Sequence, residues 1–425
     1  MKLRSICKSV FCIIISLIIA LSLCSCQKVK LMKLYVKDYG IVPNDITYTS
    51  ENTKKINKLV KKAEKGQLII FGEGTYYFDG AIEVADKEVF SVSGTYTKIV
   101  NTAYDSKSSD TSLSQIFKIK NCDQLFINSF TLSYYRYNSF CASISKHNYS
   151  NNYTYLHPYD EFNSDTKVTV SGDEPISSCY MENEHGLLTP YNALDIIKEQ
   201  NAGYYVEKII GETSRSVCYE FSSNAAPVIS VEDSNNVEFE DVNIKESAGT
   251  AFEIKNSSNT KIAKSTFSVT ENKDNAVLSI KNVINADNVS GDTVVSECDF
   301  NGISGNAVTV NGSGNVTVES CSFSNIASNG LAISNTSFNI INCGFSYISK
   351  SAISAANTAE NSQVSNCKFD VIGKSIISAD ASGNISTSNI TASAPIYTNE
   401  PYELNDTEIT ETDNTIATKA TETTK

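Results

Sequence analysis

The second half of the chain repeats one pattern of apolar and polar positions. Each copy starts at a polar turn residue and has an apolar residue at the third position, most often a cysteine at the sixth, and most often a phenylalanine at the eighth. The sixth position holds Val242, Ser265, Cys298, Cys321, Cys343, Cys367 and Ser388. The eighth position holds Ile244, Phe267, Phe300, Phe323, Phe345, Phe369 and Ile390. An earlier copy places Ile127, Phe130 and Leu132 in the same three columns.

Short alternating runs within each copy predict β-strands. An isoleucine follows the phenylalanine, and a run such as "AVTV" at 307–310 comes next, so each copy holds three half-buried strands separated by polar turns. Such a unit cannot bury its inner face alone, and stacking the units gives a parallel β-solenoid with about 4.8 Å between coils. Parallel crossovers favour the right-handed form. The pattern therefore predicts an all-β protein, a right-handed parallel β-helix.

One step in the cysteine column is longer than the others. The steps are 23, 33, 23, 22, 24 and 21 residues. We assign the ten extra residues to two turns, three in "VTENKD" and seven in "NVINADNVSG". This predicts an enlarged turn at 283–291 that overhangs the solenoid.

The four cysteines of the column are expected to be stacked free thiols beside an aromatic ladder. Cysteine behaves as a small hydrophobic residue inside a core. In-register parallel neighbours keep their Cβ atoms farther apart than the roughly 3.8 Å of a disulfide, so disulfides are the less favoured alternative. A line of inward thiols also does not suit a tetrahedral metal site, and the three scattered histidines show no ligand spacing. We predict no metal and no cofactor.

A Lys-rich amphipathic segment between Ser50 and Gly66 predicts a helix. Its apolar face carries Ile56, Leu59, Val60 and Ala63. An open solenoid end exposes core and strand edges, so we expect this helix to cap the N-terminal end.

The phrase "DYGIVPND", this helix and "KGQLIIFGEGTY" resemble the N-terminal cap of the pectate-lyase superfamily of right-handed β-helix proteins. The matching residues are Asp38, Tyr39, Gly40, Asp45, Gly66, Phe71, Gly74 and Tyr76. The chain departs from the pattern at Ile46, Ser50 and Glu51. The resemblance covers residues 35–133 and 226–396 and implies the fold and a polysaccharide partner. The expected domains are the cap and first coils at 33–133 and the β-helix repeats at 226–396. These motifs build the cap, and the catalytic motifs of the polygalacturonases and pectate lyases are missing.

The N-terminus resembles a bacterial lipoprotein signal. Lys2, Arg4 and Lys8 precede the apolar run "VFCIIISLIIALSL", and "LCSC" ends at Cys26. The resemblance implies cleavage after residue 25, acylation of Cys26, a tether at 26–32 and a lipid-anchored, extracytoplasmic location on the cell membrane. A simple secretory peptide or N-terminal anchor is the alternative. The net charge of −13 and pI of about 4.9 make nucleic acid an unsuitable partner.

Two segments interrupt or end the repeat. Residues 134–225 are Tyr-rich and are expected to form a small inserted β subdomain. Tyr134, Tyr135 and Tyr137 are candidates for stacking on sugar rings, with ordinary packing in a sheet as the alternative. Cys122, Cys141, Cys179 and Cys218 leave the disulfide pattern open. Residues 397–425 are Thr-rich, and we expect a disordered tail.

Two classes of function remain open. As an enzyme, a glycoside hydrolase or polysaccharide lyase, the protein needs converging acids. The candidates are Glu297, Asp299 and Glu319, which fall on adjacent coils beside turn 283–291, where crowding would let one of them act as an acid. Solvated surface acids are the alternative. The other class is a non-catalytic module that binds glycan or protein. We expect a monomer.

Overall fold

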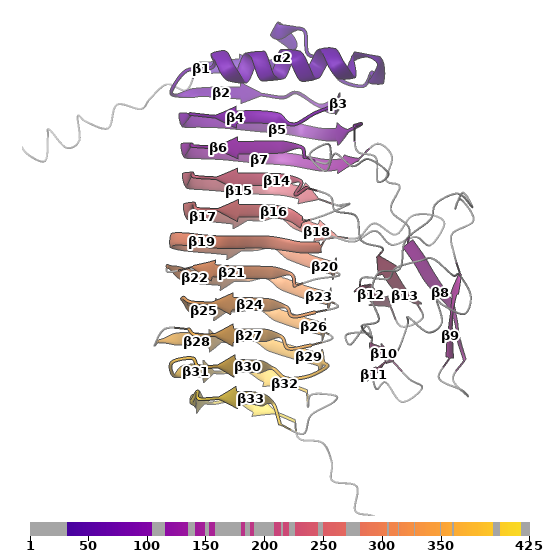
Figure 1. The fold of residues 1–425 in the computed structure, drawn as a ribbon, viewed down its shortest axis with the longest axis vertical. Coiled ribbons are helices and arrows are strands. Elements are labelled where there is room, and N and C mark those ends of the chain that lie inside the picture. Colours follow the sequence, from indigo (N-terminus) through magenta and orange to yellow (C-terminus); the bar gives the residue numbers. More distant parts are fainter. Residues whose placement is uncertain are drawn as a thin grey trace, which may run out of the picture.

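The computed structural model describes residues 32–103, 115–134, 226–244, 250–268 and 281–417, and six strands between 141 and 220. The last long range has short gaps at 304–305, 313, 327, 349, 359–360 and 394–399. The coils stack into one elongated column with a helix across its N-terminal end (Figure 1).

Each coil contributes one strand to each of three parallel ladders. The first ladder contains β1 (Met32–Tyr35), β2 (Gln67–Ile70), the first parts of β5 (Glu88–Asn101), β7 (Asp123–Tyr134) and β15 (Asn235–Ile244), then β17 (Ser258–Ala263), the second part of β19 (Lys281–Ser296), β22 (Asn315–Glu319), β25 (Ser337–Ile341), β28 (Ser362–Ser365), β31 (Ile385–Ser388) and β34 (Ile409–Thr412).

The second ladder follows the first around one corner of the coil. It contains β3 (Gly74–Phe78), the second parts of β5, β7 and β15, then β18 (Thr266–Ser268), β20 (Asp299–Ile303), β23 (Ser322–Ile326), β26 (Gly344–Ile348), β29 (Lys368–Ile372), β32 (Thr391–Ala392) and β35 (Thr415–Ile416).

The third ladder closes the coil. It contains β4 (Ile82–Ala85), β6 (Phe117–Lys120), β14 (Ile229–Glu232), β16 (Thr250–Lys255), the first part of β19, β21 (Val308–Gly312), β24 (Leu331–Ser334), β27 (Ile353–Ala356), β30 (Ile377–Asp380) and β33 (Tyr402–Asn405). The right-handed parallel β-helix is confirmed, with three strands per coil.

The corner between the first and second ladders is a column of left-handed residues. Its members, with φ between 50° and 62°, are Ser129, Asp241, Lys264, Glu297, Ser320, Asn342, Asn366 and Asn389. Short polar side chains tolerate this conformation best, and six of these eight residues are Asn, Asp or Ser.

The inward columns behind this corner are as predicted. Cys298, Cys321, Cys343 and Cys367 are buried free thiols. The rings of Phe267, Phe300, Phe323, Phe345 and Phe369 stack with centroid distances of 5.0, 4.9, 4.7 and 5.0 Å.

The thiols also make hydrogen bonds. Each donates to the carbonyl two residues earlier, at 3.2–3.3 Å. The Cys343 N–H donates to the Cys367 Sγ at 3.4 Å, and the hydroxyl of Ser265 accepts from Val242 N–H in the same way at 3.0 Å. The column therefore selects a small side chain that can pair with a buried backbone donor.

The last copy of the repeat lies two residues out of its predicted register. Val364 pairs with Thr387 and Phe369 pairs with Ala392, so Ile390 follows Cys367 in the column. Ile385 instead stacks on Ser362, in the inward column that neighbours the column of Val364. A shift of two residues leaves every side chain on the same face of the strand, so apolar pattern alone did not distinguish the two alignments.

The predicted enlarged turn at 283–291 is wrong. These residues belong to the continuous strand β19, in which Ile284 pairs with Phe252 and Thr293 pairs with Thr260. Most of the extra residues therefore precede Ile284, where 269–280 lie outside the described residues. No overhang stands at 283–291.

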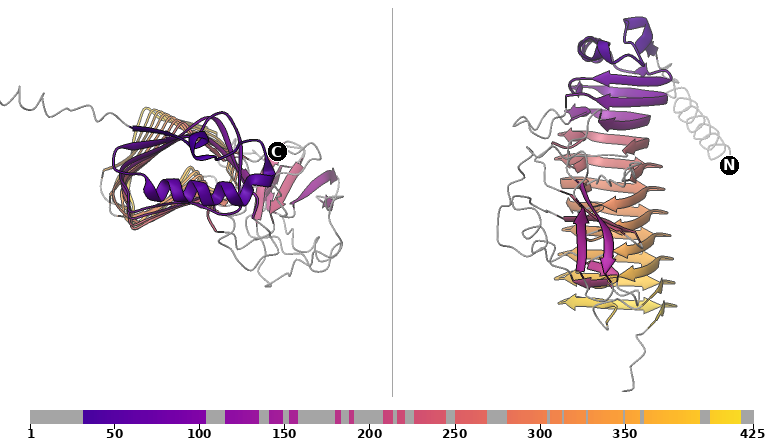
Figure 2. Two further views of the ribbon diagram at one scale, coloured as in Figure 1. Left: turned by 90° about the horizontal axis from the view of Figure 1, so that it is seen from above. Right: turned by 90° about the vertical axis from the view of Figure 1, so that its right-hand side faces the viewer.

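The cap is a helix, α2 (Thr49–Lys62), preceded by the 3-10 turns η1 (Val36–Tyr39) and η2 (Ile46–Tyr48). It lies across the mouth of the first coil (Figure 2). The predicted apolar face is buried, with Ile56, Leu59, Val60 and Ala63 at most 5% exposed. Asn52 is also buried, and its amide bonds both the N–H and the carbonyl of Val42.

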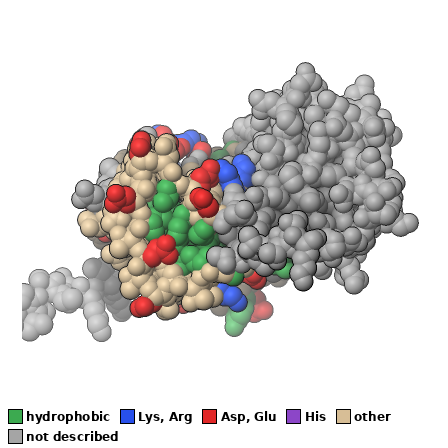
Figure 3. Space-filling model, turned by 90° about the horizontal axis from the view of Figure 1, so that it is seen from below, with side chains coloured by type: hydrophobic (Ala, Val, Ile, Leu, Met, Phe, Trp, Pro, Cys, Tyr) green, Lys and Arg blue, Asp and Glu red, His purple; other side chains and the backbone are tan. Residues whose placement is uncertain are grey.

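The other end of the solenoid corrects the tail prediction. β33, β34 and β35 add one more coil that pairs with β30, β31 and β32. Tyr402, Ile409 and Ile416 pack against the core, because they recur where the ladders need inward side chains. Apolar side chains at this open end are surrounded by acidic ones (Figure 3).

The insertion leaves after β7 and the chain returns at β14. It contains a four-stranded antiparallel sheet in the order β12–β13–β8–β9 and the pair β10–β11. Their bounds are β8 (Cys141–Asn148), β9 (Tyr153–His157), β10 (Tyr180–Glu182), β11 (Leu188–Pro190), β12 (Lys208–Thr213) and β13 (Ser216–Glu220). The side chains of Cys141, Cys179 and Cys218 lie outside the described residues, whereas Cys122 is a buried free thiol.

Candidate functional site

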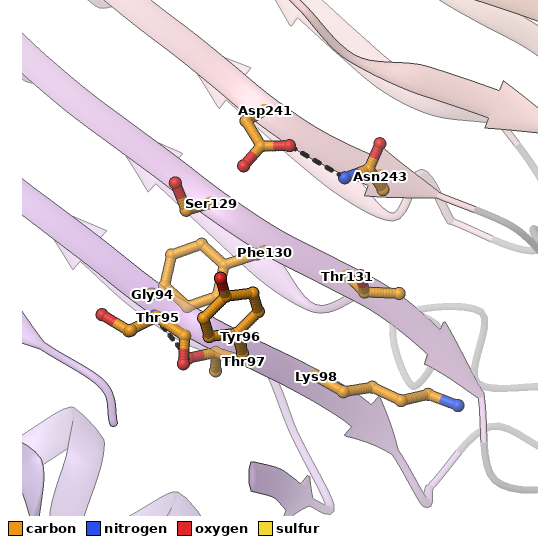
Figure 4. Close-up of a pocket in the computed structure, with 10 residues that line it drawn as sticks. All are labelled: Gly94, Thr95, Tyr96, Thr97, Lys98, Ser129, Phe130, Thr131, Asp241 and Asn243. Atoms are coloured by element: carbon orange, nitrogen blue, oxygen red, sulfur yellow. Dashed lines mark hydrogen bonds between the residues drawn. The ribbon is translucent and has the colours of Figure 1, made fainter. Parts of the chain in front are cut away.

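A groove of about 800 Å³ opens on the outer surface near the N-terminal end, at the corner between the first and second ladders. Three successive strands form it, β5, β7 and β15 (Figure 4). Its lining residues are Gly94, Thr95, Tyr96, Thr97, Lys98, Ser129, Phe130, Thr131, Asp241 and Asn243.

The groove exists because β5 is longer than its neighbour at this corner. Ser93 pairs with Asn128 and Thr97 pairs with Phe130, so β5 has two residues more than β7 between these pairs. At Gly94 a Cβ would lie 2.1 Å from the Ser129 carbonyl oxygen, so only glycine fits there. The Thr97 hydroxyl accepts from Thr95 N–H at 2.9 Å and donates to the Gly72 carbonyl at 3.0 Å, which fixes the bulge.

Tyr96 stands at the top of this bulge. Its φ is 49° and its side chain is 88% exposed, the largest exposure among the large apolar side chains of the described residues. A left-handed tyrosine is strained, and the strain is retained only where the surrounding structure imposes it. The ring is thereby presented to solvent as a flat apolar surface beside polar groups (Figure 4).

The polar side of the groove is a column of outward side chains. Lys98 pairs with Thr131, and Thr131 pairs with Asn243 in the next coil. The Asn243 amide donates to Asp241 Oδ1 at 3.1 Å, and its oxygen accepts from Thr266 N–H at 3.2 Å. Both partners fix the orientation of Asn243, and through it the carboxylate of Asp241 (Figure 4).

The three predicted acids lie elsewhere. Glu297, Asp299 and Glu319 are exposed, and none of them lines the groove. Glu297 and Glu319 do lie on adjacent coils, since Glu297 N–H donates to the Glu319 carbonyl at 2.9 Å. Asp299 pairs with Thr266, which puts it two coils beyond Asn243 in the same outward column.

Surface lysines offset part of this acidic region. Lys264 forms an ion pair with Glu240 at 2.7 Å. The hydrogen bond to Glu240, and after it the charges of Glu240 and Glu297, raise the pKa of the Lys264 ammonium. The predicted overhang at 283–291 is absent, because these residues are part of β19. The catalytic assignment of Glu297, Asp299 and Glu319 stays a prediction, and their exposure in the described part of the chain also fits solvated surface acids.

The predicted sugar-stacking tyrosines also change. Tyr134 is only 5% exposed and belongs to the solenoid core, so its ring is not available for stacking. Tyr135 and Tyr137 lie outside the described residues. The sequence pattern pointed to this Tyr-rich segment and did not identify Tyr96. The stretch "SGTYT" at 93–97 interrupts the apolar–polar alternation of β5, and this interruption was the available signal for the bulge.

The groove suits binding more directly than bond cleavage. Hydrolysis of a glycoside uses two carboxylates about 5–9.5 Å apart, and Asp241 is the one carboxylate among the described lining residues. No three His, Cys, Asp or Glu side chains within the described ranges gather in a way that could hold a metal ion. None of the helices in these ranges has the length and apolarity needed to cross a bilayer.

Comparison with known proteins supports the fold. A family model described as "Right handed beta helix region" matches residues 216–369. The solved structure of Geobacillus virus E2 ORF18 is similar with a TM-score of 0.50 and 11% identity, over 90% of this chain and 62% of that one. This chain therefore spans less than two thirds of that protein.

Two other solved structures have lower TM-scores. The surface adhesin PfbA of Streptococcus pneumoniae has a TM-score of 0.46 and 12% identity, with 91% of each chain covered. The mannuronan C-5 epimerase AlgE4 A-module of Azotobacter vinelandii has a TM-score of 0.45 and 13% identity, with 90% of this chain and 95% of that one covered. No curated protein matches the chain in sequence. The stacked parallel ladders and the match over residues 216–369 define the fold class: this chain is a right-handed parallel β-helix protein.

Proposed function

We propose that this protein is a lipid-anchored surface protein that recognises a polysaccharide through the groove at Tyr96. The observation that carries the proposal is an 88% exposed tyrosine, held at a left-handed φ beside a fixed Asn–Asp pair. Sugar rings present apolar faces and a rim of hydroxyls, and they suit an aromatic surface flanked by amide, carboxylate and hydroxyl groups. Cys26 would supply the anchor, and the protein would act as a monomer.

Cleavage is the second candidate function. The Asp241 carboxylate favours it, because that group lies where a bound glycan would contact it. A cleaving enzyme would need a further acid or base from residues outside those that line the groove.

The test is a panel of neutral and acidic polysaccharides, scored for binding and for released reducing ends. Tyr96→Ala should weaken binding about two- to twelvefold, the worth of one aromatic contact of about 0.5–1.5 kcal/mol. The matched control is Tyr347→Ala, because Tyr347 is also exposed (39%) and left-handed (φ 55°) but lies on β26, outside the groove. Equal binding by wild type and Tyr96→Ala would refute the assignment of the groove.

A further inference from the structure

The N-terminal cap is basic although the protein as a whole is acidic. Residues 32–66 contain eight lysines and four acidic residues, whereas the whole chain has a net charge of −13. The opposite end of the solenoid has the reverse character. Its last coil, residues 402–416, contains five acidic residues and no lysine or arginine.

The lysines of α2 point away from the solenoid. Lys54, Lys58 and Lys61 recur at i, i+4 and i+7 and so form one stripe along the helix. All three are exposed, and the buried residues Ile56, Leu59, Val60 and Ala63 occupy the opposite face. α2 lies across the mouth of the first coil (Figure 2). Because its buried face packs on that coil, the stripe on the opposite face is directed away from the solenoid, along the long axis.

These lysines are not used by the fold. Among the described residues, Lys54, Lys58 and Lys61 form no ion pair. Lys55, by contrast, pairs with Glu51 at 2.5 Å and donates to the Gly40 carbonyl at 2.7 Å. The stripe is therefore a set of free positive charges on a rigid support.

Exposed apolar side chains are concentrated in the same cap. Of the eight large apolar side chains exposed in the described part of the chain, five belong to the cap. They are Met32 (58%), Tyr35 (40%), Tyr39 (45%), Ile46 (38%) and Tyr48 (38%). Lysine beside exposed tyrosine and aliphatic groups is the composition of protein surfaces that rest in a membrane interface.

We propose that the cap docks on an anionic bilayer surface and holds the solenoid upright on it. The charge of the stripe complements anionic headgroups, and the tyrosines suit the headgroup region. The described chain starts at Met32, on this same end, and residues 26–31, which remain after the predicted cleavage, contain Lys28 and Lys30 and no acidic residue, which adds to the attraction. The groove then lies in the coils nearest the bilayer.

The acidic remainder of the protein does not oppose this docking. Successive coils are about 4.8 Å apart, and the screening length at physiological ionic strength is about 8 Å. Charges more than two coils from the cap are therefore largely screened from the surface. The inference goes beyond glycan recognition, and either can fail without the other.

The experiment uses the polypeptide without its first 26 residues, which removes any acyl anchor and keeps every described residue. It is sedimented with vesicles of phosphatidylcholine alone or mixed with phosphatidylglycerol. Binding is expected only to the anionic vesicles, and it should fall as salt is raised. Lys58→Gln/Lys61→Gln should weaken it about 25-fold, at about fivefold per lysine. The buried face of α2 is unchanged in this variant, and circular dichroism checks its folding.

The matched control is Lys118→Gln/Lys368→Gln, which removes two exposed lysines from the side walls of the solenoid. It should bind anionic vesicles within about twofold of wild type, since less than one lysine's contribution is lost. Absence of binding to anionic vesicles, or an equal loss in both double variants, would overturn the proposal. The proposal would also be overturned if the protein self-associates without vesicles and Lys58→Gln/Lys61→Gln abolishes this self-association. The cap would then dock on the acidic end of a second copy.

Discussion

Replacing Phe323 with alanine removes the centre of the aromatic ladder. The ring is fully buried and stacks on Phe300 at 4.9 Å and on Phe345 at 4.7 Å. Truncation of a core phenylalanine lowers the free energy of unfolding by about 3–5 kcal/mol. Two lost ring contacts, at about 0.5–1.5 kcal/mol each, place Phe323→Ala in the upper part of that range.

Phe369→Ala is the matched comparison. Phe369 is equally buried, but it stacks on Phe345 at 5.0 Å on one side and meets Ala392 on the other. Phe369→Ala should therefore lower the free energy of unfolding by less than Phe323→Ala does, and the difference should be one ring contact, about 0.5–1.5 kcal/mol. Urea unfolding followed by far-ultraviolet circular dichroism measures both losses. A loss of under about 1 kcal/mol for Phe323→Ala, or an equal loss for Phe369→Ala, would refute the stacking argument.

Three further predictions concern the cysteines. The buried thiols of the described solenoid should not react with a thiol reagent until the protein unfolds. They are Cys122, Cys298, Cys321, Cys343 and Cys367. Rapid reaction in the native state would contradict their inward orientation. The neighbouring thiol, and burial, raise the pKa of Cys321 and of Cys343 to about 12, from an ordinary value of 9.0. The stability that these two thiols contribute is complete below pH 9.0 and should be lost as the pH rises towards 12, by about 1.4 kcal/mol per pH unit per thiol. Urea unfolding at several alkaline pH values measures this loss. A free energy of unfolding that stays constant between pH 9.0 and 12 would refute the prediction. Cys26→Ala should move the protein from the membrane fraction to the soluble fraction in a high-salt wash, which suppresses the proposed docking of the cap, and full retention in that wash after signal removal would exclude the acyl anchor.

The repeat was readable from the sequence because every coil must place the same kind of side chain in the same column. Cys298 and Phe300 recur in register for that reason, and the apolar face of α2 follows from its spacing. The pattern did not determine register in the last coil, where Ile385 fits either of two inward columns.

The groove could not be predicted in the same way. It depends on β5 having two residues more than β7 at this corner, and such a bulge can be recognised only by comparison with the neighbouring coil. Glu297 and Glu319 are neighbours on adjacent coils, as expected. The predicted cleft around them required a turn at 283–291, and those residues form part of the strand β19 instead. Tyr402, Ile409 and Ile416 lie in a Thr-rich composition that hid a further coil.

A crystal structure with the best-binding glycan of the panel tests the central claim most directly. The account predicts a sugar ring against Tyr96, with its hydroxyls within hydrogen-bond distance of Asp241 and Asn243. A glycan bound elsewhere on the solenoid, with the groove at Tyr96 open to solvent, would contradict it.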